Sequence, residues 1–287
     1  MRGADRVKEA LFPADDAAKT PVLFLVPGNP GLVRFYHTFL GSLHAHLGQR
    51  HLALCVSHAG HVEAGNVAAT GLYSLEQQIE HKLAILDRLP AGTPVVLLGH
   101  SIGAYMCLEI ARRRPQMRIE RVFALFPTVR SLNDGLSPVV RWMMLPQVRY
   151  LSSLAVGLLP RAFFGLLMGV RHYLGFDSKY DADARRLIMN EMLTEGVMHN
   201  ILYLVYTEAK YVRELDREQI AASRDKTTYI YGLTDQYTPH AFVDEMRTLV
   251  PPAQVLWADE GVNHAFCLEH SLQVARQVAG LMHEHGA

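Results

Sequence analysis

The sequence predicts an α/β domain: a mostly parallel β-sheet flanked by helices, with a helical insertion between the two halves of the sheet. Short apolar runs typical of strands alternate with segments of helical periodicity, a pattern that favours right-handed crossovers and parallel pairing. One apolar run leads directly into Gly99-His100-Ser101-Ile102-Gly103 and a helix-like segment. The alternation stops over residues 129–216 and then resumes.

The individual elements follow from apolar spacing and from turn residues. Four strands are expected before the insertion, at residues 21–26, 51–56, 95–98 and 119–126. The helices between them are expected over residues 35–47 and 74–88. After the insertion come strands at 227–231 and 254–257, and helices near 240–249 and 271–283.

A chain of 287 residues can hold one large α/β domain with an insertion, or two small domains. Because strands resume after the insertion, we expect a single domain over residues 1–287. Residues 129–216 are then a helical lid within that domain and not a second catalytic domain.

The composition excludes several classes of protein. With 49% hydrophobic and 20% charged residues the chain is expected to be globular. The formal net charge of +0 and scattered basic residues argue against a nucleic-acid partner. Cys55, Cys107 and Cys267 lie far apart without metal-type spacing, so we expect reduced thiols. The first residues lack the apolar core of a secretory signal, which favours a cytoplasmic location.

The segment around Ser101 is typical of a nucleophile elbow, a sharp strand-to-helix turn that exposes a serine hydroxyl. Gly99 and Gly103 suit the elbow because side chains would crowd so tight a turn. His100 and Ile102 flank the serine. The Gly-x-Ser-x-Gly pattern is weak alone, and its position between a strand and a helix gives it weight.

A serine nucleophile needs a base, and the base needs a carboxylate that orients it. In the α/β-hydrolase fold these residues follow the serine in the order acid, then histidine, each after a strand. Asp235 follows strand 227–231 and His264 follows strand 254–257. The sequence therefore predicts this fold, with Ser101, Asp235 and His264 as the catalytic triad. Asp259 and Glu260 are rival acids on the loop to His264, but that loop does not normally supply the acid.

The oxyanion hole is expected from two backbone N–H groups. One is that of Ile102, directly after the nucleophile. The other is assigned to Asn29, because its neighbours Pro27 and Pro30 have no N–H to donate. The alternative is that the segment from Pro27 to Gly31 is a plain turn stiffened by proline.

Fifteen histidines raise the question of a metal. His37, His58, His61 and His240 lie on segments expected at the same edge of the sheet. No zinc-type spacing on a helix accompanies them. We expect neither a catalytic metal nor a cofactor.

These motifs bring a family resemblance into view: the sequence resembles the lipid-droplet-associated hydrolases, a family of serine α/β-hydrolases. The likeness runs from about residue 21 to the C-terminus, and its motifs are segments 27–31, 75–82, 99–105 and 126–128 together with the triad. It implies a hydrolase of lipid esters, such as sterol esters or acylglycerols, at the surface of lipid droplets or of the endoplasmic reticulum. His81 and Lys82 match the family too, and we interpret them as structural.

The insertion is rich in apolar residues, at 139–146 and again at 151–170. Pro160-Arg161 interrupts the second stretch, and a central arginine costs roughly 3 kcal/mol in hydrocarbon, so we do not expect a membrane-spanning helix. Three interpretations stay open: a lid that binds acyl chains, a hairpin in a lipid interface, or ordinary packing onto the core. Residues 183–213 have the pattern of an ordinary amphipathic cap helix.

The predicted function is therefore hydrolysis of lipid carboxylic esters through an acyl-enzyme on Ser101, with peripheral contact between the lid and a lipid-droplet or membrane surface. A thioesterase or an esterase of soluble small molecules is an alternative, because the fold alone does not decide the substrate. A lipid-binding or droplet-organising protein with little catalysis is a further alternative.

Overall fold

The computed structural model describes residues 20–61, 71–160, 162–166 and 182–284. Six parallel strands form one sheet in the order β2-β1-β3-β4-β5-β6. The strands are β1 (Val22–Val26), β2 (Leu52–Cys55), β3 (Val95–His100), β4 (Ile119–Leu125), β5 (Thr227–Tyr231) and β6 (Val255–Trp257). The predicted α/β-hydrolase fold class, with its parallel sheet and helical insertion, is confirmed.

Both faces of the sheet are buried. In β3, Val95 and Leu97 pack into one core cluster, whereas Val96 and Leu98 pack into the other. Because successive side chains point to opposite faces and helices cover both, the central strands β1 and β3 are apolar and buried almost throughout. For this reason, short apolar runs in the sequence predict the positions of these strands to within a few residues.

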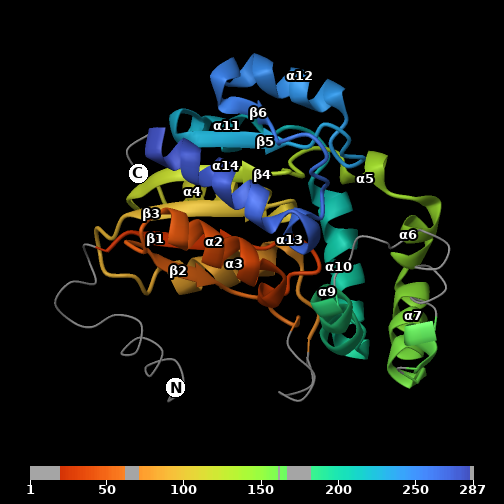
Figure 1. Ribbon diagram of the computed structural model, residues 1–287. Helices are drawn as coiled ribbons and strands as arrows, with labels where there is room; N and C mark the ends of the chain where they lie inside the picture. Colours follow the sequence, from red (N-terminus) through yellow and green to blue (C-terminus); the bar gives the residue numbers. More distant parts are fainter. Residues whose placement is uncertain (1–19, 62–70, 161, 167–181, 285–287) are drawn as a thin grey trace.

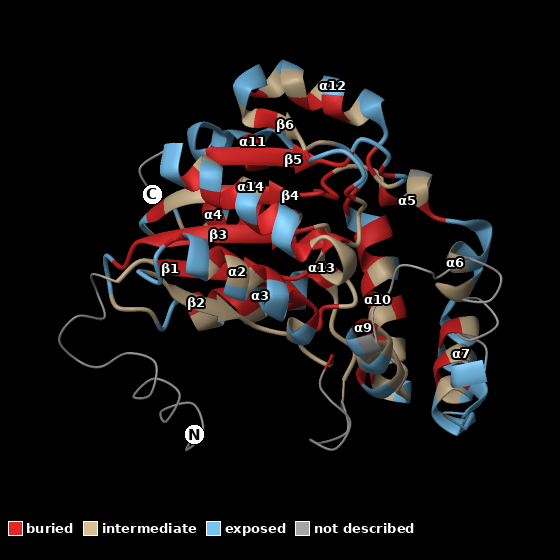
Figure 2. Ribbon diagram, in the orientation of Figure 1, coloured by how far each residue is buried: buried red, intermediate tan, exposed pale blue. Residues whose placement is uncertain are grey.

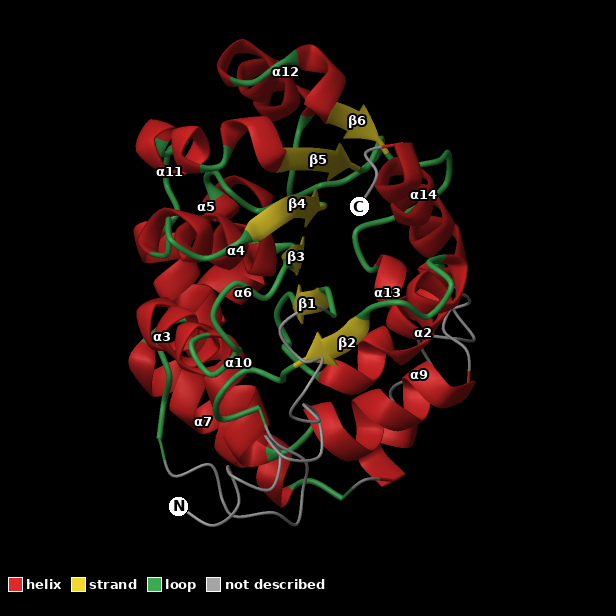
Figure 3. Cartoon of the chain, turned by 90° about the vertical axis from the view of Figure 1, so that its left-hand side faces the viewer, coloured by secondary structure: helices red, strands yellow, loops and turns green. Residues whose placement is uncertain are grey.

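Helices cover the two faces, as the turned view in Figure 3 shows. One face carries α3 (Leu75–Leu86), α4 (Ile102–Arg113), α11 (Arg217–Ala222) and α12 (His240–Leu249). The other face carries α2 (His37–His46), α13 (Phe266–Glu269) and α14 (Ser271–Glu284). Short 3₁₀ turns complete the framework at Val33–Tyr36, Arg224–Lys226 and Pro252–Gln254.

The insertion between β4 and β5 is helical wherever the structure describes it. It comprises α5 (Leu132–Gly135), α6 (Pro138–Met143), α7 (Pro146–Leu158), a helical turn at 162–166, α9 (Ala182–Leu187), a π-helical segment (Ile188–Met192) and α10 (Glu195–Tyr211). Figure 1 shows α10 beside the sheet and α7 outside α10, and Figure 2 shows how much of α6 and α7 is exposed. None of the described helices combines the length and apolarity needed to cross a membrane.

The insertion differs from the expected helices in two places. Helix α7 ends at Leu158 because Leu159, which precedes Pro160, is extended, as residues before proline usually are. The rest of the apolar stretch at 151–170 includes residues 161 and 167–170, which lie outside the described residues. The helix expected over 183–213 is interrupted, because Thr194 is extended and its hydroxyl accepts a hydrogen bond from Val197 N–H, which starts α10 anew.

The direction in which the chain adds strands to the sheet reverses between β1 and β3. The chain places β2 on one side of β1, then returns to place β3 on the other side, and the later strands follow β3. Ligands in open α/β sheets bind where such a reversal occurs, beyond the carboxyl ends of the strands. The loops after β1 and β3 both emerge at this point. They carry Asn29 and Ser101, respectively.

Candidate active site

Ser101 lies at a strained turn between β3 and α4. Its backbone has φ 54° and ψ −122°, a combination that non-glycine residues rarely adopt. A Cβ on Gly103 would lie 2.2 Å from the carbonyl oxygen of Val26, and one on Gly99 would lie 2.5 Å from Ala104 Cα. The chain around the serine is therefore so close to β1 and to its own helix that only glycine fits at both positions.

A continuous series of hydrogen bonds joins Ser101 to a histidine and a carboxylate. His264 Nε2 lies 3.0 Å from Ser101 Oγ, and His264 Nδ1 lies 2.6 Å from Asp235 Oδ2. Asp235 follows β5, and His264 lies between β6 and α13, so the two arrive from adjacent strands. Asp259 and Glu260 are exposed, and the partner of His264 Nδ1 is Asp235.

The Asp235 carboxylate is buried and firmly held. Its Oδ1 accepts a hydrogen bond from Tyr237 N–H at 2.8 Å. Burial raises the pKa of Asp235, but the bonds to His264 and to Tyr237 N–H outweigh it, so the pKa lies below its usual value. An ionised carboxylate here can orient the imidazole and stabilise a positive charge on it.

Thr128 also contacts the serine, which the sequence analysis did not anticipate. Its hydroxyl lies 3.0 Å from Ser101 Oγ, and its N–H donates to the Ser101 carbonyl at 3.2 Å. Thr128 is buried in the loop after β4. The sequence feature that indicates this contact is the position of Thr128 shortly after β4, which ends at the same edge of the sheet as β3.

The loop after β1 runs directly against the nucleophile. A Cβ built on Gly28 would lie 2.9 Å from Ser101 Cβ. The Asn29 side-chain amide donates to the Ile201 carbonyl at 3.0 Å, so this side chain points toward α10. Among the described residues, the backbone N–H groups of Asn29 and Ile102 make no hydrogen bond. Both N–H groups are therefore available to another acceptor.

Helix α10 carries polar side chains on its buried face, contrary to the ordinary amphipathic helix expected. Asn200 bonds the main chain of Gly71 and Tyr73, and the Thr207 hydroxyl accepts the N–H of Leu75 at 3.0 Å. Glu208 is buried and lies 3.5 Å from the Asn29 amide nitrogen. Burial raises the pKa of Glu208 to about 8, against the smaller opposing effect of the Asn29 amide.

The histidines considered as metal ligands lie in three different places. His58 and His61 are buried with their rings 5.5 Å apart, and burial lowers the pKa of both. His240 contacts the Trp257 ring, and His37 lines a surface pocket. Within the described ranges, no three His, Cys, Asp or Glu side chains are arranged to hold a metal ion.

Lys82 is buried, and its ammonium donates to the Ser57 carbonyl at 2.8 Å. Burial lowers its pKa to about 7. His81 Nδ1 lies 3.3 Å from the same nitrogen. These contacts suit the structural role that the sequence suggested for both residues. The three cysteines are free thiols.

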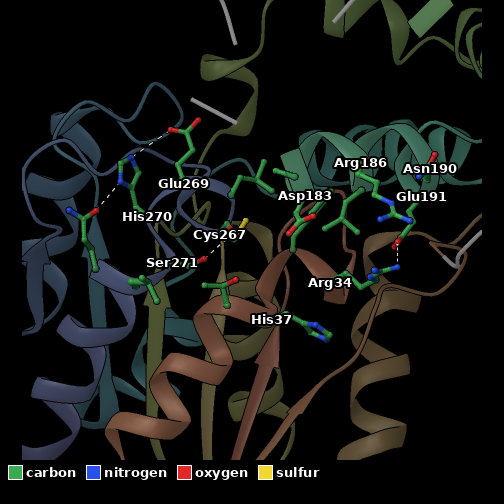
Figure 4. A pocket seen from close by; sticks show the side chains of 17 residues that line it. Arg34, His37, Asp183, Arg186, Asn190, Glu191, Cys267, Glu269, His270 and Ser271 are labelled. Carbon is green, nitrogen blue, oxygen red and sulfur yellow. Dashed lines mark hydrogen bonds and ion pairs between the residues drawn. The ribbon is translucent and has the colours of Figure 1, made fainter. Parts of the chain in front are cut away.

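A pocket of about 760 Å³ lies between α2, α9, α13 and the start of α14 (Figure 4). Arg34 pairs there with Glu191, and His270 Nδ1 lies 2.8 Å from Gln273 Oε1. Its lining is largely polar and charged and includes none of the three residues of the Asp235–His264–Ser101 series. A pocket for an acyl chain is expected to be mainly apolar, so this one does not fit that role.

Comparison with known proteins identifies relatives along most of the chain. The family model described as lipid-droplet associated hydrolase matches residues 19–267. A lipid droplet-associated hydrolase of Dictyostelium discoideum is 30% identical over 94% of this chain and 90% of its own. The protein of that name from Homo sapiens is 28% identical over 92% of this chain and 86% of its own.

Solved structures show the same fold at low identity. An epoxide hydrolase of the α/β-hydrolase superfamily, from metagenomes of hot environments, has a TM-score of 0.64 at 16% identity, covering 94% of this chain and 92% of that one. A thermophilic esterase from Thermogutta terrifontis has a TM-score of 0.59 at 15% identity, covering 93% and 90%. The fold and the family matches agree with the resemblance inferred from the motifs. The chain therefore belongs to the lipid-droplet-associated hydrolase family and is a hydrolase of the α/β-hydrolase fold.

Proposed function

We propose that this protein is a serine esterase that cleaves lipid esters, of the sterol ester or acylglycerol type, through an acyl-enzyme on Ser101. The observation that carries the proposal is the hydrogen-bonded series from Asp235 through His264 to Ser101 at a strained turn. A serine hydroxyl is a weak nucleophile near neutral pH, and an imidazole held by a buried carboxylate supplies the missing base.

The reaction proceeds in two steps. His264 Nε2 takes the Ser101 proton while Oγ attacks the ester carbonyl, and the N–H groups of Asn29 and Ile102 stabilise the oxyanion. His264 then returns the proton to the departing alcohol, leaving an acyl-serine. Water enters, gives a proton to His264 and attacks the acyl carbon, so that the acid leaves and Ser101 regains its proton. Asp235 fixes the tautomer and stabilises the imidazolium. This chemistry requires no metal or cofactor.

Two features support a lipid substrate. The relatives are named for their association with lipid droplets. The outer helices of the insertion expose large apolar side chains, including Trp142 at 60%, Leu151 at 61% and Leu158 at 75% exposure. Apolar area of this kind, gathered in one segment, is typical of surfaces that meet lipid or another protein.

The catalytic part is tested with p-nitrophenyl esters from acetyl to palmitoyl, comparing the wild type with Ser101→Ala. The matched control is Ser42→Ala, which removes a hydroxyl from α2. We expect rates that rise with chain length, vanish in Ser101→Ala and persist in Ser42→Ala. A short-chain optimum would indicate a soluble-substrate esterase. Equal rates in wild type and Ser101→Ala would refute an acyl-enzyme on this serine and favour the lipid-binding alternative.

The surface part is tested by flotation with triolein droplets coated with phospholipid. Replacing Trp142 and Leu158 by serine together is expected to reduce the bound fraction several-fold, because both expose apolar area on α6 and α7. The control, Leu272→Ser, removes a side chain that is 57% exposed on α14. Equal binding by all three proteins would exclude α6 and α7 as the lipid-contacting surface.

A further inference from the structure

A second series of buried hydrogen bonds runs behind the nucleophile and connects two loops of the site. Tyr36 Oη accepts a hydrogen bond from Gly28 N–H at 2.8 Å and lies 2.6 Å from His100 Nδ1. On the other side of the ring, His100 Nε2 lies 2.9 Å from the main-chain oxygen of His264. The series therefore begins in the loop after β1, passes through the residue before Ser101, and ends on the backbone of His264.

The acceptor at the far end fixes the direction of every bond in the series. A carbonyl oxygen only accepts, so His100 Nε2 must carry the proton that it donates to His264. The pKa of His100 is lowered to about 3 by burial, so the ring is neutral and Nδ1 is bare. Tyr36 O–H must then donate to Nδ1. The Cys267 thiol also lies near the Tyr36 hydroxyl. Because the Tyr36 proton is used in the bond to His100, the thiol can only donate to the Tyr36 oxygen or contact it weakly.

The side chains in this series have little room to move. Tyr36 is 3% and His100 4% exposed, and both rings pack edge-on against Phe266, with centroids 6.4 and 4.8 Å away. Phe126 lies edge-on to His100 at 6.3 Å. Buried polar groups that are fully paired in such surroundings hold one arrangement, because breaking any bond leaves a desolvated group unpaired.

We propose that Tyr36 and His100 are positioning residues that hold the oxyanion loop at Gly28 and Asn29 and the loop of His264 in register with Ser101. This proposal rests on the proposed esterase function and deepens it. Neither side chain touches the reacting atoms. Tyr36 acts through the N–H of Gly28, which precedes Asn29, and His100 acts through the main-chain carbonyl of His264.

Three variants separate the parts of the series. Tyr36→Phe keeps the ring and removes the hydroxyl, leaving Gly28 N–H and His100 Nδ1 unpaired. His100→Phe removes both ring nitrogens, whereas His100→Gln retains an N–H that can reach the His264 carbonyl. The control is Tyr229→Phe, which removes a buried hydroxyl on the opposite face of the sheet.

The readouts are kcat and KM on a short p-nitrophenyl ester, with kcat expressed per active site titrated with a fluorophosphonate. A displacement of about 1 Å can cost roughly 100-fold, so we expect kcat per site to fall about 10-fold in Tyr36→Phe and 10- to 100-fold in His100→Phe. KM is expected to change less than about 3-fold. His100→Gln is expected to recover most of the loss, and Tyr229→Phe to match the wild type.

The outcomes distinguish this proposal from the one it rests on. If Ser101→Ala abolishes activity while Tyr36→Phe and His100→Phe keep wild-type kcat per titrated site, the positioning role is refuted and the esterase stands. Variants that lose only titratable sites and thermal stability would likewise refute it, because such a loss is purely structural. Full activity in Ser101→Ala would overturn the esterase itself.

Discussion

Glu208 provides a sharp test of how the insertion is built into the domain. The carboxyl group is 3% exposed on α10, and the contact described for it is the Asn29 amide at 3.5 Å. Because burial disfavours the charged form and no cation among the described residues is found to offset it, its pKa is raised from 4.5 to about 8. The folded protein therefore holds this group protonated at neutral pH, whereas the unfolded chain releases the proton.

The consequence is a stability that falls as the pH rises. Below about pH 4.5 both states are protonated and Glu208 costs nothing; between pH 4.5 and 8 the unfolded state gains from ionisation and the folded state does not. With these two pKa values, one-site linkage gives a loss of about 3 kcal/mol in the free energy of unfolding between pH 5 and 8. Replacement by glutamine, which has the same shape and no charge, is expected to remove this loss.

The measurement is urea unfolding of the wild type and Glu208→Gln at pH 5, 6, 7 and 8. The control is Glu214→Gln, which removes an exposed carboxylate just beyond α10. Subtracting the free energy of unfolding of the wild type from that of the variant at each pH removes the contributions of the titrating groups that both proteins share. The variant's advantage over wild type is expected to grow by about 3 kcal/mol across this range, and that of the control to stay within about 0.5 kcal/mol. A flat difference for Glu208→Gln would refute the reasoning, because it would mean that the carboxyl group ionises normally and is hydrated.

Three substitutions at the site and one comparison substitution on α14 give further tests. Gly103→Ala places a Cβ 2.2 Å from a main-chain oxygen at the end of β1 and is expected to lower the free energy of unfolding by about 2 kcal/mol. Gly280→Ala, in open space on α14, should instead stabilise by roughly 0.5–1 kcal/mol; urea unfolding checks both. Asp235→Asn is expected to lower kcat about 10⁴-fold with little change in Tm, since it favours the wrong imidazole tautomer; a loss below about 10-fold would contradict this role. Thr128→Val removes one neutral hydrogen bond to Ser101, and single-turnover phosphonylation is expected to slow about 5-fold; an unchanged rate would show that Thr128 does not fix the serine rotamer.

The fold could be predicted because its signals are local. Strand 227–231 and helix 240–249 were located from apolar spacing and turn residues, and the structure has both with the same bounds. Helix α13 was missed because four residues are too few to show a helical period. The interruption before α10 was missed because Thr194 is a weak sequence signal, and its role as a cap depends on a backbone angle.

The site could be predicted only where it follows the ends of strands. Ser101, Asp235 and His264 each lie in the segment that follows a predicted strand, so the order of strands predicts that they meet at one edge of the sheet. Their catalytic roles stay a prediction. The supporting contacts have no such signal. Tyr36 meets His100 across 64 residues, and Asn29 meets Glu208 across 179. Nothing in the spacing of these residues indicates that they touch, since each pair comes from elements that pack only in three dimensions.

These contacts change what the insertion can do as a lid. The sequence suggested one cover over the site, but α10 is bonded through Ile201, Asn200 and Thr207 to loops of the domain, including the loop of Asn29. If α10 moved away to admit substrate, it would take the Asn29 side chain with it and disturb the loop proposed to stabilise the oxyanion. Helix α7 in turn packs on α10, with the buried Arg149 guanidinium over the rings of Tyr203 and Tyr206, while α6 and α7 expose apolar side chains on their outer surface. We therefore expect α10 to stay in place on the domain during turnover.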